Sequence, residues 1–274
     1  MAFIGGGVMA EAMIRAVLDR HLVPPSRMSV TGPRRERRAE LAKQFGIAAH
    51  ASNLEAAKLA DVVVLSVKPQ VLPTVMKELR GKLRADQLVI SIVAGANMRA
   101  LETGLAHPTI VRAMPNTPAQ VGMGVTAWYP SHAVTTEQRE RTKSIVAALD
   151  EELMVEDESY IDMATALSAT GPTYVFLLME ALVDAGVHLG FSRRVAEELV
   201  LRTVEGSALF ARKSGRHLAE LRNMVTSPGG TSAAAIYQLE KGALRTVLSK
   251  AVYAAYQRSS ELGAAAERKV TKDE

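Results

Sequence analysis

Apolar residues are distributed in two different ways along the chain. Up to about residue 155, short continuous apolar runs alternate with stretches of helical spacing, which is typical of βαβ units around a parallel sheet. From Glu158 to about Leu262, helical spacing continues almost without interruption. We therefore predict an α/β domain over residues 1–156 and an all-α domain over residues 157–274, with a charged, disordered tail at 267–274.

Three of the apolar runs end in turns of similar character. Asp61–Val67, Leu88–Val93 and Thr109–Met114 are rich in β-branched residues, as expected of strands buried on both faces of a sheet. Small or proline-containing segments follow them, at 68–70, 94–96 and 115–118. Because doubly wound sheets bind ligands at the carboxyl ends of parallel strands, we predict a ligand site there. Each turn taken alone is equally well explained as a segment that ends its strand and binds no ligand.

The remaining pattern predicts further elements. We expect strands at 28–31, 47–49, 125–128 and 153–155. Helices are expected at 10–19, 54–59 with Asn53 as N-cap, 136–149, 174–189, 192–213, 233–240, and in a last apolar stripe from 244 to 255. Polar turns at 168–173 and 226–232 interrupt the helical half. The second turn either presents free helix amides to an anion such as a carboxylate, or simply connects two helices.

The first strand runs directly into a glycine loop. Gly5, Gly7 and Ala10 fit the G-x-G-x-x-G/A dinucleotide fingerprint, in which the glycines allow a tight turn and close approach of a pyrophosphate. The phosphates would then meet the N-terminus of the following helix. The alternative is a flexible turn without a ligand. The context favours a Rossmann-type doubly wound domain.

The strand at 28–31 ends without the acidic residue that would bind a ribose 2′-hydroxyl. Thr31, Arg34 and Arg35 occupy this position instead. A hydroxyl and an arginine would accept a 2′-phosphate, so we infer NADPH in preference to NADH. The alternative is a solvated helix face, which is our expectation for Arg37 and Arg38 in either case.

Composition narrows the possible classes. No apolar run approaches the roughly 18 residues of a membrane span, and no basic segment precedes an apolar signal region, so we expect a cytoplasmic protein. The chain has no cysteine, which excludes disulfides and thiolate metal sites, and we expect no metal. A net charge of +4 suits an anionic ligand, but with 4% aromatic residues we expect no nucleic-acid binding. The apolar helical faces exceed what one small bundle would bury, which predicts a homodimer.

Several motifs together resemble the pyrroline-5-carboxylate reductase family over nearly the whole chain. The most specific is Val225–Thr231, and the others are Phe3–Gly7 with Met9-Ala10, Val67–Pro69, Met114–Pro118, Gly171-Pro172, Leu239-Glu240 and Arg245. This resemblance implies a Rossmann domain followed by a helical dimerisation domain, with dimers that can assemble as a decamer of five. It also implies reduction of the C=N bond of 1-pyrroline-5-carboxylate to L-proline, with hydride from NADPH or NADH.

The resemblance further implies a site in two parts. The cofactor part would comprise Gly5, Gly6, Gly7, Val8 and Met9 in the glycine loop, Thr31, Arg34 and Arg35 for the phosphate, Asn53 for the adenine ribose, Val67, Lys68 and Pro69, and Ala94 beside the nicotinamide. The substrate part would use the amides of Gly230, Thr231 and Ser232 for the carboxylate and Glu158 near the ring nitrogen. It would be contributed by the partner subunit.

Three positions depart from the family pattern. Ser232 stands where the family usually has a threonine, whose hydroxyl is the proposed donor to the imine nitrogen; Asn223 stands where aspartate is common, and Val8 where asparagine is frequent. Serine keeps the hydroxyl but lacks the methyl group that fixes the rotamer. Since an unaided hydroxyl is a weak acid, we treat Ser232 as a hydrogen-bonding and positioning group at the catalytic centre and leave the source of the proton open.

Other functions compete with this resemblance. A β-hydroxyacid dehydrogenase has the same two-domain plan but needs a catalytic lysine, and no lysine occurs between Ser144 and Arg212. A non-catalytic NADPH-binding regulator would not need the intact loop at 226–232. A reductase of another cyclic imine remains open, because the sequence does not fix the ring size.

Overall fold

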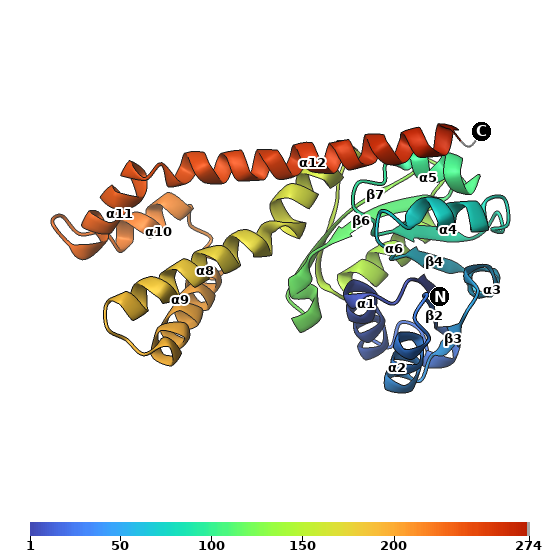
Figure 1. Cartoon of the computed structure of the whole chain (residues 1–274), viewed down its shortest axis with the longest axis horizontal. Coiled ribbons are helices and arrows are strands. Elements are labelled where there is room, and N and C mark those ends of the chain that lie inside the picture. Colours follow the sequence, from blue (N-terminus) through green and yellow to red (C-terminus); the bar gives the residue numbers. More distant parts are fainter. Residues whose placement is uncertain (273–274) are drawn as a thin grey trace. The chain divides into compact units, whose positions relative to one another are not determined.

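The chain forms two compact units in the computed structural model. The structure describes the backbone of residues 1–272 and the side chains of residues 1–264. The expectation of a disordered tail at 267–274 was wrong for residues 267–272, which continue the last helix, and residues 273–274 lie outside the described residues. The sheet unit comprises Met1–Gly171 together with the chain from Ala254, and the helical unit comprises Pro172–Tyr253 (Figure 1). The domain limits expected from the sequence, 1–156 and 157–274, stay a prediction.

The sheet unit is built around eight strands in the order β3-β2-β1-β4-β5-β6-β7-β8. Neighbouring strands are parallel except β6 and β7, which are antiparallel. The strands are β1 Ala2–Ile4, β2 Ser29–Thr31, β3 Ala48–His50, β4 Val62–Leu65, β5 Leu88–Ser91, β6 Ile110–Pro115, β7 Gly124–Pro130 and β8 Asp150–Met154. β4, β5 and β6 are adjacent and parallel, so their carboxyl ends meet at one edge, as the sequence predicted.

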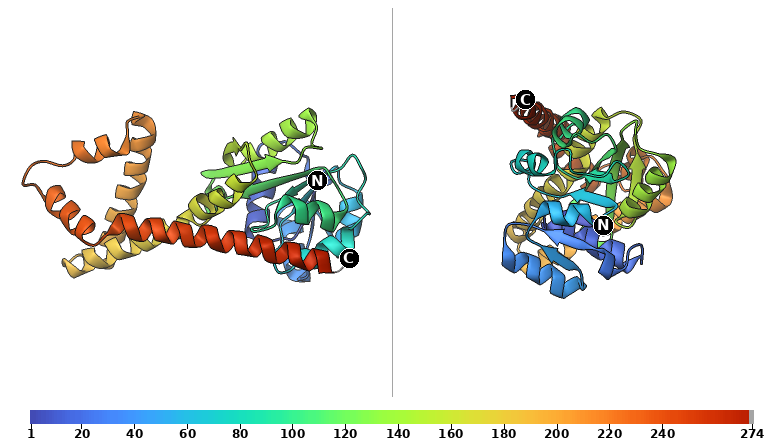
Figure 2. Two further views of the ribbon diagram at one scale, coloured as in Figure 1. Left: turned by 90° about the horizontal axis from the view of Figure 1, so that it is seen from above. Right: turned by 90° about the vertical axis from the view of Figure 1, so that its right-hand side faces the viewer.

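Helices cover both faces of this sheet (Figure 2). Helices α1 (Val8–Asp19), α2 (Arg35–Phe45) and α6 (Thr136–Ala147) contribute to the core on one face, which includes Phe3 and Val64. Helices α3 (Asn53–Lys58), α4 (Leu72–Leu79) and α5 (Met98–Leu105) contribute to the core on the other face, which includes Ile4 and Leu65. Short helical turns, η1 (Pro25–Arg27) and η2 (Thr117–Val121), lie between these elements. This arrangement confirms the doubly wound α/β fold.

Two local expectations were wrong. Asn53 is not the N-cap of α3, because Ser52 caps this helix by accepting a hydrogen bond from the Glu55 amide, which leaves the Asn53 side chain to bond elsewhere. The polar turn expected at 168–173 does not form, because residues 168 and 169 end a π-helix, η3 (Thr165–Ala169), and residues 171–173 begin α8 (Gly171–His188). The π-helix directly follows α7 (Ser159–Ala164). Single π-helical turns inside helices are frequent at functional sites, and polar composition alone does not distinguish them from loops.

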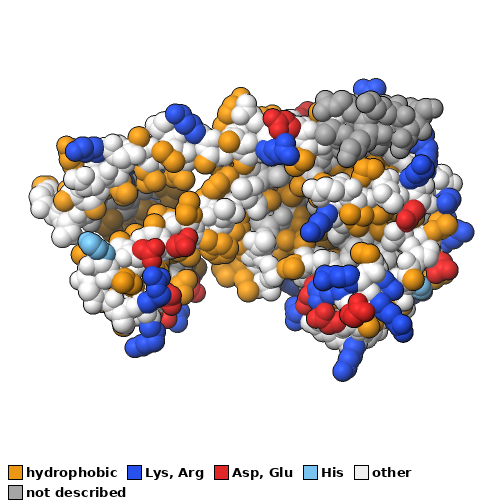
Figure 3. Space-filling view, in the orientation of Figure 1, with side chains coloured by type: hydrophobic (Ala, Val, Ile, Leu, Met, Phe, Trp, Pro, Cys, Tyr) orange, Lys and Arg blue, Asp and Glu red, His pale blue; other side chains and the backbone are white. Residues whose placement is uncertain are grey.

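The helical unit leaves most of its large apolar side chains on the surface. After α8 come α9 (Arg193–Ser214), α10 (Leu218–Met224), α11 (Thr231–Lys241) and the start of α12 (Leu244–Lys272). Within the described part of α8–α11, only Val183 and Ala196 are buried. Apolar side chains gather on the surface of this unit (Figure 3). Those exposed on α8 and α9 include Phe176, Leu177, Leu178, Leu182, Leu199, Leu201, Leu209 and Phe210.

One helical stretch is long and apolar enough to cross a membrane, judged by its length and composition alone. It runs from Ser159 to His188, and 11% of its most apolar window is buried. A helix at an apolar interface between proteins meets the same criteria, so this observation alone carries little weight.

Candidate functional site

The glycine loop lies between β1 and α1 at the carboxyl edge of the sheet. Gly5 has φ +109°, and a Cβ atom there would lie 2.6 Å from the Ser66 carbonyl oxygen, so only glycine fits. Gly7 is the N-cap of α1, and a Cβ atom at this position would meet no heavy atom within 4 Å. Ala10 is fully buried, as the third fingerprint position requires. The loop therefore combines a tight turn with a helix N-terminus that a pyrophosphate can approach.

A polar relay lies at the end of β2 where an adenosine ribose would bind. Thr31 is fully buried, and its hydroxyl donates to the Asn53 side-chain oxygen at 2.7 Å. The Asn53 amide group donates in turn to the Glu78 carboxylate at 2.6 Å. The structure thus brings together two predicted residues, Thr31 and Asn53, and adds Glu78 from α4. No sequence signal marks Glu78, because a single acid on a helix face has no local pattern.

Two arginines beside this relay are available to bind a phosphate. Arg34 is the N-cap residue of α2 and Arg35 begins the helix, and both are exposed. Neither makes an ion pair among the residues that the structure describes. Their position beyond the end of β2 fits the predicted recognition of a 2′-phosphate.

Arg37 is not the solvated side chain that the sequence suggested. Its Nε donates to the Gly6 carbonyl oxygen at 3.0 Å, and its guanidinium also pairs with Glu11 and Glu40. Hydrogen bonds from Arg37 hold the pKa of Glu11 below its ordinary value. Arg38 likewise donates to the Gly32 carbonyl oxygen. These contacts fix the glycine loop against α2, so both arginines support the loop and Arg37 is not free for a ligand.

The turns after β4 and β5 complete this edge of the sheet. Val67, Pro69 and Ala94 are half-buried, and Lys68 is exposed. The Ser66 hydroxyl donates to the Gly5 carbonyl oxygen at 2.9 Å and ties the first turn to the glycine loop. The predicted cofactor residues of the sheet unit therefore lie along one edge, from Arg34 at β2 to Ala94 after β5.

Glu158, predicted near the substrate, has other partners in this structure. Its carboxylate accepts from Arg112 Nη1 and from the Met98 amide, both at 2.5 Å. Arg112 also contacts Asp162, and its side chain is 3% exposed. Burial and the neighbouring Glu158 carboxylate raise the pKa of Glu102. Arg112 is a charged residue within an otherwise apolar strand segment. Such a residue indicates an ion pair inside the protein, and the prediction from sequence overlooked it.

The predicted substrate loop lies in the helical unit. Gly230 is the N-cap of α11, and its own amide donates to the Ser227 carbonyl oxygen at 3.0 Å. Thr231 and Ser232 open the helix, where amides have no intrahelical acceptor. The loop therefore offers the amides of Thr231 and Ser232, the Ser232 hydroxyl and the positive end of a helix dipole to a small anion.

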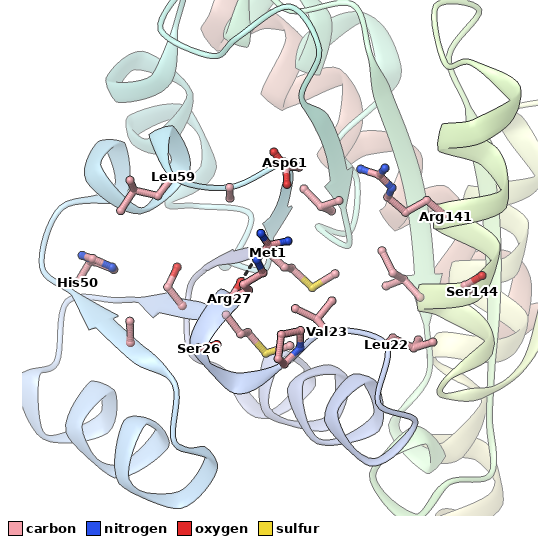
Figure 4. A pocket seen from close by; sticks show the side chains of 17 residues that line it. Met1, Leu22, Val23, Ser26, Arg27, His50, Leu59, Asp61, Arg141 and Ser144 are labelled. Carbon is pink, nitrogen blue, oxygen red and sulfur yellow. Dashed lines mark hydrogen bonds between the residues drawn. The ribbon is translucent and has the colours of Figure 1, made fainter.

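A hollow of about 700 Å³ lies elsewhere on the sheet unit (Figure 4). It is lined by residues near the starts of strands, including Met1, Ser29 and Val62, and by Arg141 of α6. This is the amino edge of the sheet, whereas dinucleotides bind at the carboxyl edge. The hollow is therefore separate from the cofactor residues.

Two comparisons with protein families match different parts of the chain. Residues 158–262 match the family described as pyrroline-5-carboxylate reductase dimerisation. Residues 1–95 match the family described as NADP oxidoreductase coenzyme F420-dependent.

Similar proteins extend over the whole chain. A pyrroline-5-carboxylate reductase of Pseudomonas aeruginosa is 43% identical over 96% of this chain and 96% of its own length. A pyrroline-5-carboxylate reductase of Synechocystis is 41% identical over 96% of this chain and 98% of its own length. A solved pyrroline carboxylate reductase of Plasmodium falciparum with NADP bound is 32% identical with a TM-score of 0.87, covering 96% of this chain and 97% of its own. A Coxiella burnetii structure is 38% identical with a TM-score of 0.87, covering 95% and 97%.

Proposed function

The chain belongs to the pyrroline-5-carboxylate reductase family, and on this premise we propose which of its residues bind cofactor and substrate. It is an NAD(P)H-dependent oxidoreductase that reduces the C=N bond of 1-pyrroline-5-carboxylate to L-proline, the final step of proline biosynthesis. The observation that carries this conclusion is full-length similarity to several reductases of this name, combined with a glycine loop shaped for a dinucleotide. The cofactor supplies the hydride.

The sheet unit is proposed to bind the cofactor. The amides of the loop at 5–9 would receive the pyrophosphate, Asn53 the adenine ribose, and Arg34 and Arg35 the 2′-phosphate. Val67, Lys68, Pro69 and Ala94 would border the nicotinamide half. The buried Thr31 hydroxyl supports this assignment, because it holds the Asn53 side chain at the end of β2. The absence of an acid at that strand end favours NADPH over NADH.

The two glycines of the loop give this assignment a direct test. Gly7→Ala adds a methyl group into open space, so we expect unchanged stability but a Michaelis constant for NADPH raised at least about 10-fold, because the pyrophosphate loses its close approach. Gly5→Ala should instead destabilise the protein, since its Cβ would meet the Ser66 carbonyl oxygen. Thermal unfolding and steady-state kinetics of both variants measure this. Unchanged NADPH kinetics in Gly7→Ala would contradict the placement of the pyrophosphate.

The substrate carboxylate is proposed to bind the start of α11. Thr231 and Ser232 supply amides that no helical carbonyl accepts, and Gly230 shapes the cap although its amide is already bonded to Ser227. Ser232 would donate a hydrogen bond to the ring nitrogen and position it, since a hydroxyl is too weak an acid to supply a proton unaided near neutral pH. Glu158 near the ring nitrogen stays a prediction.

The helical unit is proposed to bind a second copy of the chain. Its exposed apolar side chains lie within the matched dimerisation segment, and a partner copy would bury them. We propose that the chain forms a homodimer and that five dimers can assemble as a decamer. We also propose a cytoplasmic location, with neither a membrane nor a nucleic acid as partner.

A substrate panel tests the reaction. We expect the purified protein to oxidise NADPH rapidly with 1-pyrroline-5-carboxylate, far more slowly with the six-membered cyclic imine, and not at all with a hydroxyacid and oxidised cofactor. Preference for the six-membered ring would instead identify a reductase of another cyclic imine. Tight NADPH binding without turnover of either imine would favour the non-catalytic regulator.

A further inference from the structure

A partly buried ion network contacts the turn that follows β5. Its centre is Arg112 on β6, whose side chain is 3% exposed. Nη1 donates to the Glu158 carboxylate at 2.5 Å and Nη2 to the Asp162 carboxylate at 3.3 Å. The Ser259 hydroxyl of α12 donates to the same Asp162 oxygen at 2.9 Å. All of these residues belong to the sheet unit, and each carboxylate has more than one donor.

The network reaches the turn through a backbone amide. Glu158 accepts from the amide of Met98, the first residue of α5, whose N-cap is Asn97. The first amides of a helix have no intrahelical acceptor, so Glu158 supplies a partner that the helix itself cannot. A carboxylate near this end is also favoured by the helix dipole. The position of Glu158 is set in turn by Arg112.

The same turn also packs closely against α12. Gly95 has φ +71°, and a Cβ atom there would lie 2.6 Å from Leu262 Cβ. Ala94 packs on the apolar cluster of Met114, Ala127 and Ile161. The residues 94–98, which we call the β5 turn, are therefore fixed by an ion network, an apolar cluster and a helix.

We propose that Arg112 and Glu158 are positioning residues that hold the β5 turn in the shape required by the nicotinamide half of the cofactor. This inference rests on the proposed function, which places Ala94 beside the nicotinamide. Glu158 then acts on the reaction through the Met98 amide and is held by Arg112, with both contacts on its Oε1 atom, in place of the expected contact with the ring nitrogen. A contact with the β5 turn and a contact with the substrate lead to different predictions for variants of Glu158.

Two probes separate the halves of the cofactor site. Adenosine 2′,5′-bisphosphate occupies only the adenosine end, whereas NADP⁺ also reaches the β5 turn. For Glu158→Ala we expect NADP⁺ binding to weaken roughly 10-fold, as for loss of one hydrogen bond to a charged group, with binding of the bisphosphate unchanged within about 2-fold. Titration calorimetry measures both. Glu156→Ala is the matched control, because Glu156 is exposed two residues away and has no bond among the described residues.

Two further readouts distinguish positioning from general destabilisation. Hydrogen exchange of the peptide that contains Met98 should accelerate in Glu158→Ala and return toward the wild-type rate in Glu158→Gln, which keeps an acceptor oxygen. Arg112→Lys, which keeps the charge but loses the two-pronged contact, should give an intermediate NADP⁺ affinity.

The outcomes are distinct. Unchanged NADP⁺ binding and exchange in Glu158→Ala, with a raised Michaelis constant for 1-pyrroline-5-carboxylate, would overturn the inference in favour of a substrate contact. Equal weakening of both probes would also overturn it, because the effect would not be local to the β5 turn. If the wild-type protein bound neither probe, the proposed function itself would fail.

Discussion

Helices α4 and α8 show how differently the two units are stabilised. On α4, Leu72, Val75, Met76 and Leu79 are 0–3% exposed, whereas on α8 Phe176, Leu177, Leu178 and Leu182 are 44–65% exposed. Both helices carry apolar side chains, but only α4 has a sheet to cover them. Since burial contributes about 25 cal/mol per Å² of apolar area, the sheet unit is stabilised within one chain, whereas the apolar surface of the helical unit would be stabilised by the second copy that we propose.

The largest effect is expected from a charge on the apolar surface of α8. Phe176→Glu places a carboxylate where we propose that a second copy docks, and burying an unpaired charge costs several kcal/mol. We expect the mass in solution to fall to that of one chain, 29.4 kDa, with loss of almost all activity. Light scattering on the purified variant measures the mass. Glu140→Lys, an exposed charge change on α6, is the control, and a Phe176→Glu variant that stayed oligomeric would contradict the assignment of this surface.

The next prediction concerns a side chain that is buried inside the sheet unit. Leu65 on β4 is fully buried, so Leu65→Ala should lower the free energy of unfolding by about 2–5 kcal/mol. Leu59 is 77% exposed, and Leu59→Ala should change the free energy of unfolding by less than about 0.5 kcal/mol. Urea titrations of the two variants measure this difference. Equal effects would mean that burial within one chain does not describe the stability of this unit.

Cofactor preference should depend on the sheet unit alone. In Arg34→Ala we expect NADPH affinity to fall roughly 10- to 100-fold, as for loss of a hydrogen bond between charged groups, with little change for NADH. Lys43→Ala, at the far end of α2, should affect neither cofactor. Dissociation constants measured for both cofactors test this, and an equal loss for NADH would remove the basis for the phosphate site.

The smallest effect concerns the pair that braces the glycine loop. Because hydrogen bonds from Arg37 lower the pKa of Glu11 in the folded state, the pair stabilises the fold above the unfolded pKa, about 4.3, and this contribution is lost as the pH falls through the lower folded value. Glu11→Gln should therefore be less stable than wild type by up to about 1 kcal/mol at neutral pH, with a smaller difference near pH 3. Unfolding measured at both pH values tests this sign. A gap that widened in acid would be inconsistent with it.

Local sequence patterns predicted elements of both units. Runs such as Asp61–Val67 identify buried parallel strands because they are almost entirely apolar, and the glycine fingerprint places the loop after β1. Long helices such as α9 were predicted within about one residue at each end. Local patterns therefore identified the fold and the edge of the sheet at which the proposed cofactor residues lie.

Contacts between distant segments could not be predicted in the same way. Arg37 was expected in solvent because its neighbours are charged, but α2 packs beside the glycine loop and brings it to the Gly6 carbonyl. Glu78 and Arg112 meet partners at least 25 residues away in sequence. The π-helix at 165–169 was also missed, since the polar and proline-containing segment at 168–173 indicates a turn.

The most direct test of the central claim is the product of the reaction. Wild-type protein incubated with NADPH and 1-pyrroline-5-carboxylate should form one L-proline for each NADPH consumed, measured by amino-acid analysis alongside absorbance. This stoichiometry would show that the hydride reaches the C=N bond. NADPH consumed without proline, or no consumption by a protein that binds NADPH tightly, would contradict the account.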